Sequence, residues 1–230
     1  LEQNKKILIH SANLSQPNLI KRRGGVKDIE IRIVKQKSKQ IVVLHLLIDT
    51  KDAMGANLVN TICESLADDL SELTSCRVGL KILSNLTDRS LINIKVKIPH
   101  QYLTKDDYDG PEVRDGIINA TDFADSDPYR ATTHNKGIMN GIDAVAIATG
   151  NDWRSIEAAA HAYACQDGRY RSLTKWFVDA DGDLVGELKM PIKVGIVGSS
   201  LKANPGAQLG LKITAAKNSN ELAIIMGSVG

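Results

Sequence analysis

The spacing of apolar and polar residues predicts alternating helices and strands along the chain. Residues 1–14 predict a helix, and the proline of the Gln16–Pro17 pair disfavours its continuation. Polar and apolar residues alternate over 28–34, as in a half-buried strand, and 41–49 is a second strand rich in β-branched and leucine residues. The polar interval between these strands is short, so we expect them to pair as a hairpin.

A long amphipathic helix is predicted over 52–73, with Asp52 as its N-cap. Its apolar positions recur every four residues at Met54, Leu58, Ile62, Leu66 and Leu70. Residues 78–83 predict a third strand. Two strands, a long helix and a further strand are typical of a ferredoxin-like unit, so we predict a small domain over 1–84 with its boundary near Asn85.

Residues 85–230 are expected to form part of a larger α/β domain, which makes the predicted fold class α+β. The predicted strands are 91–98, 144–149 and the hairpin 174–178/184–190, and the predicted helices are 111–124, 131–140, 152–165 and 205–214. The loop of this hairpin carries acidic residues at 179, 181 and 183, as the start of a calcium loop does. Met190 stands where that loop requires a glutamate, so a polar turn is favoured.

The composition is that of an ordinary globular protein, with 43% hydrophobic and 24% charged residues. A net charge of +2 gives no reason to expect nucleic acid or a membrane as a partner. The three cysteines are widely spaced and lack zinc-ligand spacing, which favours reduced thiols in a cytoplasmic protein. The chain lacks a starting methionine and ends within a helical pattern, so we expect it to be the middle of a longer protein.

Lys136 and Asp152 are the first candidates for catalysis, because a lysine near a carboxylate in an apolar setting can stabilise an oxyanion. From the residues alone, a surface lysine and a plain helix cap are the simpler interpretations. No GxGxxG motif follows a strand, so a Rossmann dinucleotide site is not supported. DAMGAN at 52–57 predicts a helix N-terminus where Gly55 allows an anion to approach. GIVGSSLK at 195–202 lacks the ending of a phosphate loop and is interpreted as a turn.

Five segments carry a more specific signal. They are DAMGANLVNT at 52–61, KILSNL at 81–86, HNKGIMNGID at 134–143, ATGNDWR at 148–154 and AHAYACQDGRYRSLTKW at 160–176. In this order they resemble the class II 3-hydroxy-3-methylglutaryl-coenzyme A (HMG-CoA) reductases. The resemblance implies reduction of HMG-CoA to mevalonate and coenzyme A by two hydrides from NADPH or NADH, or the reverse oxidation. It also implies a homodimer with active sites at the interface.

The resemblance further implies roles for individual residues. Lys136 and Asp152 are implied to be catalytic: the lysine stabilises charge on the substrate oxygen, and the aspartate contacts the lysine. Arg130 is implied to bind the substrate carboxylate and Asn140 to hydrogen-bond in the same network. The implied cofactor-binding residues are Asp52, Met54, Gly55, Asn57 and Asn85. His134 is adjacent to Lys136 but receives no role.

Some positions depart from the family pattern. The glutamate and the histidine that the family supplies from flanking regions are missing, so this segment alone is expected to be inactive. The glycine-rich GGATK pattern appears here as GSSLK at 198–202. Gln16, also expected at the cofactor site, stands where NADH-preferring relatives carry an aspartate, so a 2′-phosphate should be tolerated beside Lys21, Arg22 and Arg23, unless that trio is merely solvated. The alternatives to a reductase are a fragment that binds nucleotide without turnover and a scaffold for dimerisation.

Overall fold

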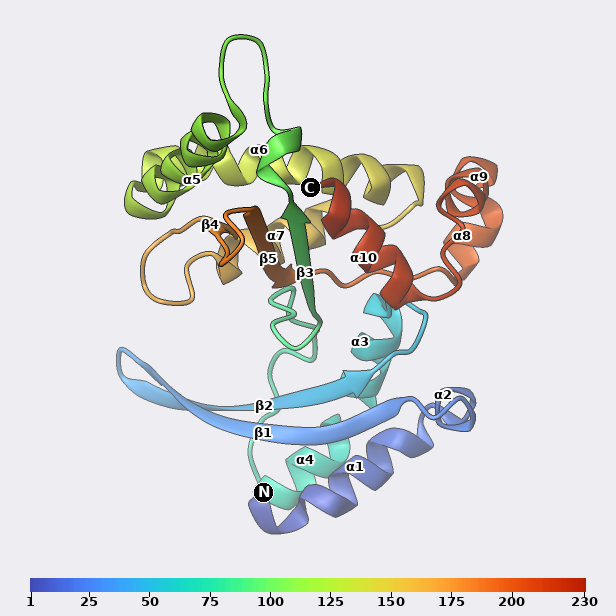
Figure 1. Ribbon diagram of the computed structural model, residues 1–230. Coiled ribbons are helices and arrows are strands. Elements are labelled where there is room, and N and C mark those ends of the chain that lie inside the picture. The colour runs from blue at the N-terminus through green and yellow to red at the C-terminus, as the bar shows by residue number, and fades with distance from the viewer. The chain divides into compact units, whose positions relative to one another are not determined.

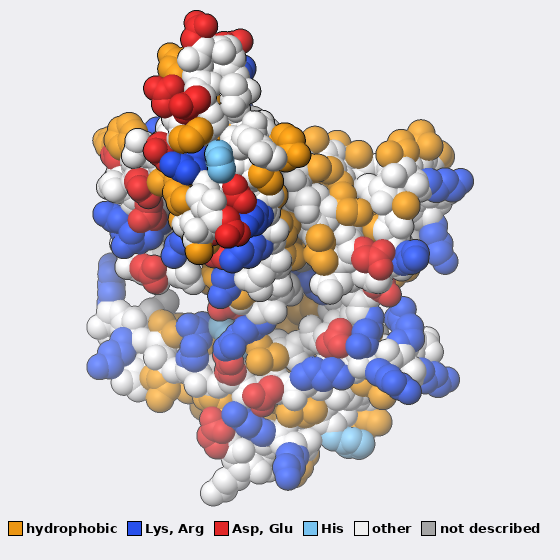
Figure 2. Space-filling model, in the orientation of Figure 1, with side chains coloured by type: hydrophobic (Ala, Val, Ile, Leu, Met, Phe, Trp, Pro, Cys, Tyr) orange, Lys and Arg blue, Asp and Glu red, His pale blue; other side chains and the backbone are white. Residues whose placement is uncertain are grey.

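The structure, a computed structural model, describes the backbone of residues 1–230 and every side chain except those of residues 199 and 200. The chain folds into two compact units, Leu1–Ser84 and Asn85–Gly230 (Figure 1), and each unit has a hydrophobic core of its own. No helix in the described part of the chain combines the length and the apolarity that a membrane crossing requires. Basic and acidic side chains are interspersed over the face seen in Figure 2, as expected for a net charge of +2.

The first unit is built on a long β-hairpin. β1 (Gly25–Gln36) and β2 (Lys39–Asp49) pair antiparallel over their whole length, which confirms the predicted hairpin. The other elements are η1 (Glu2–Asn4), α1 (Lys5–Leu14), α2 (Pro17–Lys21), α3 (Ala56–Ser65) and α4 (Ala67–Thr74). The core forms where α1 and α3 cover the hairpin, and Leu8, Ile29 and Ile62 are buried there. Burial of these side chains holds the helices against the sheet.

The predicted helix over 52–73 is interrupted in the structure. α3 begins at Ala56, so the prediction of Asp52 as its N-cap is wrong. The cap is Gly55, whose φ of 94° lies in the left-handed region that glycine adopts without a steric penalty. The helix breaks again at Leu66, a fully buried residue between α3 and α4. The apolar spacing correctly indicated helix but carried no information on these breaks.

The predicted strand over 78–83 is absent from the structure. Leu80 and Ile82 are 94% and 63% exposed, so neither side chain has a sheet surface to pack against. A strand also needs a neighbour for its ladder of hydrogen bonds, and the sheet of this unit consists of β1 and β2. The ferredoxin-like arrangement is therefore not confirmed.

The second unit is an antiparallel three-stranded sheet with helices packed against it. The strand order is β3–β5–β4, formed by β3 (Leu91–Ile98), β4 (Thr174–Val178) and β5 (Leu184–Pro191), all three of which were predicted. The helices are η2 (His100–Tyr102), α5 (Gly110–Ser126), α6 (Pro128–Ala148), α7 (Trp153–Tyr163), α8 (Ser199–Ala203), α9 (Pro205–Thr214) and α10 (Ser219–Val229). α5, α7 and α9 confirm the helices predicted over 111–124, 152–165 and 205–214.

α6 runs for 21 residues and includes the segment predicted as a strand over 144–149. It begins after Asp127, whose side chain accepts hydrogen bonds from the first turn, and Pro128 suits the first helical position. The strand prediction is wrong because alanine favours helix and Ala146 continues the buried stripe of α6. The buried residues of this stripe are Ala131, Asn135, Ile138, Met139, Ile142 and Ala146. The predicted helix over 131–140 is thus the middle of a longer one.

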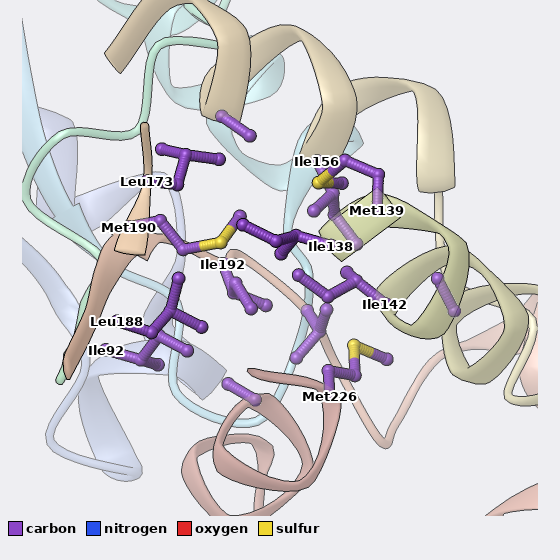
Figure 3. Close-up of a cluster of buried hydrophobic side chains, with 14 of the residues drawn as sticks. Ile92, Ile138, Met139, Ile142, Ile156, Leu173, Leu188, Met190, Ile192 and Met226 are labelled. Atoms are coloured by element: carbon purple, nitrogen blue, oxygen red, sulfur yellow. The ribbon is translucent and has the colours of Figure 1, made fainter. Parts of the chain in front are cut away.

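The core of the second unit lies between the sheet and helices α6, α7 and α10. Figure 3 shows Met190 of β5 beside Ile138 of α6, with Ile156 of α7 and Met226 of α10 in the same cluster. Each large apolar side chain buried here contributes roughly 1.5–3 kcal/mol. This packing fixes the rotation of α6 about its axis, and so determines which of its side chains face solvent.

The predicted turn over 195–202 is only partly present. A loop runs as far as Gly198, and the short helix α8 then begins at residue 199. The side chains of residues 199 and 200, in the segment GSSLK, lie outside the described part of the chain.

Candidate active site

Lys136 lies on the exposed side of α6, and Asn140 follows one turn later on that side. Its neighbour Asn135 is fully buried, and a rotation of about 100° per residue carries the next side chain out of the core. Arg130, on the same helix, is half-buried. α6 thus carries an ammonium and an amide on its exposed side, and a guanidinium that points about 120° away from Lys136 around the helix axis. Such groups can bind a carboxylate and stabilise negative charge on an oxygen atom.

Asp152 is the N-cap of α7, where its Oδ1 accepts a hydrogen bond from the Ser155 backbone N–H at 3.2 Å. It is exposed, like Lys136. At 1.5 Å per residue, the part of α6 between Lys136 and Ala148 is about 18 Å long, which exceeds the reach of the two side chains. No ion pair joins Lys136 to Asp152 in the described part of the chain. The structure therefore does not bring the two predicted catalytic residues together within one chain.

Two buried asparagines, which the sequence analysis missed, each precede one of these residues. Asn135 donates from Nδ2 to Arg171 O at 2.8 Å and accepts from Leu173 N at 3.0 Å. Asn151 donates to Gly195 O at 3.1 Å and accepts from Gly195 N at 2.8 Å. A signal for Asn135 was present, because it shares the buried stripe of α6 with apolar residues. A polar side chain at such a position indicates a satisfied internal hydrogen bond.

His134 connects α6 to β4, and its surroundings disfavour the protonated imidazole. Its Nε2 lies 2.7 Å from Thr174 Oγ1. Burial lowers the pKa of His134, and the positive charge of Arg130 lowers it further. A neutral imidazole beside Lys136 adds no competing positive charge. The structure thus gives His134 a packing role.

A chain of polar contacts links α6 to α7 behind this surface. His161 Nε2 is 2.9 Å from Glu157 Oε2, and His161 Nδ1 is 2.7 Å from the Tyr170 hydroxyl. Asp143 on α6 hydrogen-bonds to Glu157, and burial together with this neighbour raises the pKa of Asp143 to about 6. Asp143 Oδ1 is buried without a hydrogen-bond partner. This arrangement favours a proton shared by the two carboxyl groups.

The predicted cofactor residues of the first unit lie in segments that adjoin one end of its β-hairpin. β1 and β2 meet there at Gly25 and Asp49. A Cβ atom on Gly24 would lie only 2.7 Å from Asp49 O, so the loop after α2 packs directly on the end of β2. Gln16 is the N-cap of α2, and DAMGAN (52–57) follows β2. The end of the hairpin therefore carries both segments.

Within DAMGAN, the N-terminus of α3 is not capped by a side chain. Its first N–H groups and the positive end of the helix dipole are available to an anion, and Gly55 allows close approach. Asn57 is exposed and Met54 half-buried at this terminus. Asn85, the remaining predicted cofactor residue, is exposed and is the first residue of the second unit.

Three basic residues follow Gln16 closely in the sequence. Lys21, Arg22 and Arg23 are all exposed, and Figure 2 shows basic side chains over this end of the first unit. Arg22 Nε donates to Asn18 O at 3.2 Å, which folds the guanidinium back along α2. Lys21 and Arg23 remain candidates to meet a phosphate.

The acidic loop between β4 and β5 is a tight turn neutralised by a lysine. Asp179 Oδ1 accepts from the backbone N–H groups of Asp181 and Asp183 at 2.9 and 3.0 Å. Lys97 Nζ lies 2.7, 2.6 and 3.2 Å from the carboxylates of Asp179, Asp181 and Asp183. Hydrogen bonds to these carboxylates raise the pKa of Lys97. The lysine occupies the position that a cation would take, in agreement with the predicted polar turn.

Comparison with known proteins identifies the relatives of this chain. The 3-hydroxy-3-methylglutaryl-coenzyme A reductase of Archaeoglobus fulgidus is 44% identical over 228 residues, which are 99% of this chain and 51% of that protein. The probable reductase of the same name from Borreliella burgdorferi is 34% identical over 213 residues, 93% of this chain and 49% of that protein. The chain thus spans about half the length of the curated relatives it matches.

Comparison with solved structures leads to the same family of relatives. The reductase of Streptococcus pneumoniae has 42% identity and a TM-score of 0.94 over 99% of this chain and 61% of its own. The class II reductase of that organism bound to NADPH in open conformations gives 41% identity, the same TM-score, and coverage of 99% and 62%. Fold and sequence thus point to the same group of relatives. The chain belongs to the hydroxymethylglutaryl-coenzyme A reductase family, whose model matches residues 1–230.

Proposed function

We propose that the full-length protein reduces HMG-CoA to mevalonate and coenzyme A, with Lys136 stabilising the substrate oxygen in both reductions. The observation that carries this is the placement of Lys136 and Asn140 on the exposed side of a helix anchored in the core. The nicotinamide cofactor supplies the two hydrides. The thioester carbonyl becomes a hemithioacetal, which loses the coenzyme A thiol to give an aldehyde, and the aldehyde becomes the alcohol.

The Lys136 ammonium acts where negative charge appears. In each reduction the carbonyl oxygen gains charge as hydride reaches its carbon, and a fixed ammonium stabilises that charge. Arg130, with its planar pair of donors, is suited to the free carboxylate of the substrate. Asn140, one turn from Lys136, can hydrogen-bond in the same site. The general acid that protonates the departing thiolate is proposed to come from outside this chain.

The first unit fits a nicotinamide dinucleotide in two respects. The uncapped N-terminus of α3 behind Gly55 offers N–H donors to the pyrophosphate. Gln16 carries no negative charge to repel a 2′-phosphate, and Lys21 and Arg23, close to it in sequence, are exposed. The NADPH-bound pneumococcal relative supports the same cofactor. We therefore propose that NADPH is used at least as well as NADH.

The distance between Lys136 and Asp152 supports a homodimer. Both side chains are exposed, and about 18 Å of α6 lies between Lys136 and Ala148, beyond which the chain turns to reach Asp152. A two-fold axis that brings two α6–α7 pairs together antiparallel would place Lys136 of one copy near Asp152 of the second. We propose that each active site uses the lysine of one copy and the aspartate of the other. The free cysteines Cys63, Cys76 and Cys165 are compatible with a reducing, cytoplasmic location.

The test is turnover by the purified full-length protein with HMG-CoA, followed by the loss of nicotinamide absorbance. We expect Lys136→Ala to lower the turnover number by at least 100-fold, because loss of an oxyanion donor costs about 3–4 kcal/mol. The matched control is Lys212→Ala, which removes an exposed lysine from α9. A Lys136→Ala enzyme with more than a tenth of the parent rate would refute the assignment. Cofactor binding without turnover would favour the inactive alternative, and no cofactor binding would favour a scaffold.

A further inference from the structure

The two residues proposed to act in catalysis project from backbone that a buried asparagine fixes in place. Lys136 follows Asn135, and Asp152 follows Asn151. Both asparagine side chains are buried, with exposures of 0% and 9%. Each amide pairs with the backbone of a distant segment, as one strand pairs with another. We call these two pairs of hydrogen bonds the amide clamps.

The clamp of Asn135 ties α6 to the segment that leads into β4. Its Nδ2 donates to Arg171 O at 2.8 Å, and its Oδ1 accepts from Leu173 N at 3.0 Å. Both contacts cross more than thirty residues of sequence, as the separations of 36 and 38 residues show. Rotation of α6 by a fraction of a turn would break both bonds inside the core. The clamp therefore fixes the direction in which Lys136 leaves the helix.

The clamp of Asn151 ties the turn between α6 and α7 to the loop at Gly195. Its Oδ1 accepts from Gly195 N at 2.8 Å, and its Nδ2 donates to Gly195 O at 3.1 Å. Nδ2 also contacts Thr149 Oγ1 at 3.0 Å. Backbone hydrogen bonds, such as Asn151 N to Ala146 O at 2.8 Å, tie this turn to the end of α6, and the Asn151 side chain adds the link to a distant segment. Asp152 is held at the start of α7 as a result.

We propose that Asn135 and Asn151 are positioning residues that hold Lys136 and Asp152 in register for catalysis, an inference that rests on the proposed function. The two catalytic side chains themselves are exposed, so the surface around them provides little orientation. The position of the backbone therefore determines how these two side chains are aligned with the substrate and with each other across the proposed dimer. Misplacement of a catalytic group by about 1 Å can cost roughly 100-fold in rate.

The chain contains a matched control for loss of such a clamp. Asn13 in the first unit donates from Nδ2 to Val26 O at 3.2 Å and accepts from Val26 N at 2.8 Å. It makes the same two bonds to backbone, but neither neighbour in sequence has a proposed catalytic role. Asn13→Leu thus removes the same pair of hydrogen bonds from a half-buried asparagine while leaving Lys136 and Asp152 in place.

The experiment compares Asn135→Leu, Asn151→Leu and Asn13→Leu in the full-length protein at saturating substrate and NADPH, well below each melting temperature. We expect the first two variants to lose about 100-fold in kcat. The KM for NADPH should stay within about twofold, because the clamps do not position its binding segments. Asn13→Leu, with a similar fall in melting temperature, should retain kcat within about threefold. Asn135→Asp, which keeps the acceptor for Leu173 N, replaces Asn135→Leu if that variant does not fold.

A double variant separates positioning from a general loss of structure. If Asn135 acts through Lys136, then Asn135→Leu added to Lys136→Ala should lower the remaining rate by no more than about twofold. A further tenfold loss in the double variant would overturn the proposal, as would clamp variants that keep kcat at the level of Asn13→Leu. Failure of the proposed function is a separate result, seen when the unmodified protein shows no reductase activity or when Lys136→Ala alone stays active.

Discussion

Replacement of Asp143 by asparagine should stabilise the protein at neutral pH. The pKa of Asp143 is raised from 3.8 to about 6, first by burial and then by the hydrogen bond and negative charge of Glu157, while His161 opposes the shift. A carboxyl group with a raised pKa in the folded state favours folding while it is protonated. Its contribution is complete below pH about 4 and is lost as the pH rises through about 6. Above that pH, the parent protein must keep a charged Asp143 beside Glu157.

The size of the effect follows from the shift. Two pKa units correspond to about 3 kcal/mol as an upper limit, and partial exposure to solvent reduces this to about 1–2 kcal/mol. Asparagine can donate to Glu157 as the protonated acid does, without becoming charged. For a protein of this size or larger, we expect the melting temperature of Asp143→Asn at pH 8 to exceed that of the parent by about 2–6 °C.

The assay is thermal unfolding of parent and variant between pH 4 and pH 8. The gain should be largest at pH 8 and should vanish near pH 4, where the parent carries a neutral Asp143. Asp122→Asn on the exposed side of α5 is the control for removal of one negative charge. A gain that is constant across this pH range, or a variant less stable than the parent at pH 8, would show that Asp143 and Glu157 do not share a proton.

Three further outcomes are expected. Gln16→Asp should shift the preference from NADPH toward NADH in steady-state rates, because a carboxylate accepts from the ribose 2′-hydroxyl and repels a 2′-phosphate; no shift would mean that this position lies outside the cofactor site. Gly210→Ala should lower the melting temperature, because the added Cβ would overlap Ala148 O at the end of α6. Gly116→Ala in α5 has open space around it and should raise the melting temperature slightly, because alanine has the higher helix propensity. Equal changes in melting temperature for the two variants would contradict this packing. The 230-residue segment alone should show almost no reductase turnover, because general acids outside it contribute about 10²–10⁴-fold each; robust turnover would require an acid within the segment, for which His134 is the first candidate.

The limits of prediction from this sequence are physical. Alternation and turn residues gave the right strands over 91–98 and 174–178, because a half-buried strand has a period of two. Residues 144–149 show no alternation of apolar and polar positions, so periodicity could not distinguish a buried strand from the last turns of α6. The predicted strand over 78–83 failed for another reason: strand formation depends on a neighbour, which local sequence does not report.

In the candidate site, too, some features could be predicted from the sequence and others depended on contacts between distant segments. Family resemblance singled out Lys136 and Asp152, and the structure places about 18 Å of α6 between Lys136 and the turn that leads to Asp152. Their separation follows from the unbroken length of α6, which the mistaken strand prediction concealed. The buried asparagines were missed because their partners, such as Gly195, are distant in sequence. Contacts of that kind become visible only once the chain is folded.

The length of α6 also has a genetic consequence. If a complete site needs Lys136 from one copy and Asp152 from another, two inactive alleles can restore each other. Coexpression of Lys136→Ala with Asp152→Ala would form mixed dimers in which one site has lost both groups and the other has kept both. Random assembly would then return about a quarter of the parental sites, from two genes that each encode an inactive protein.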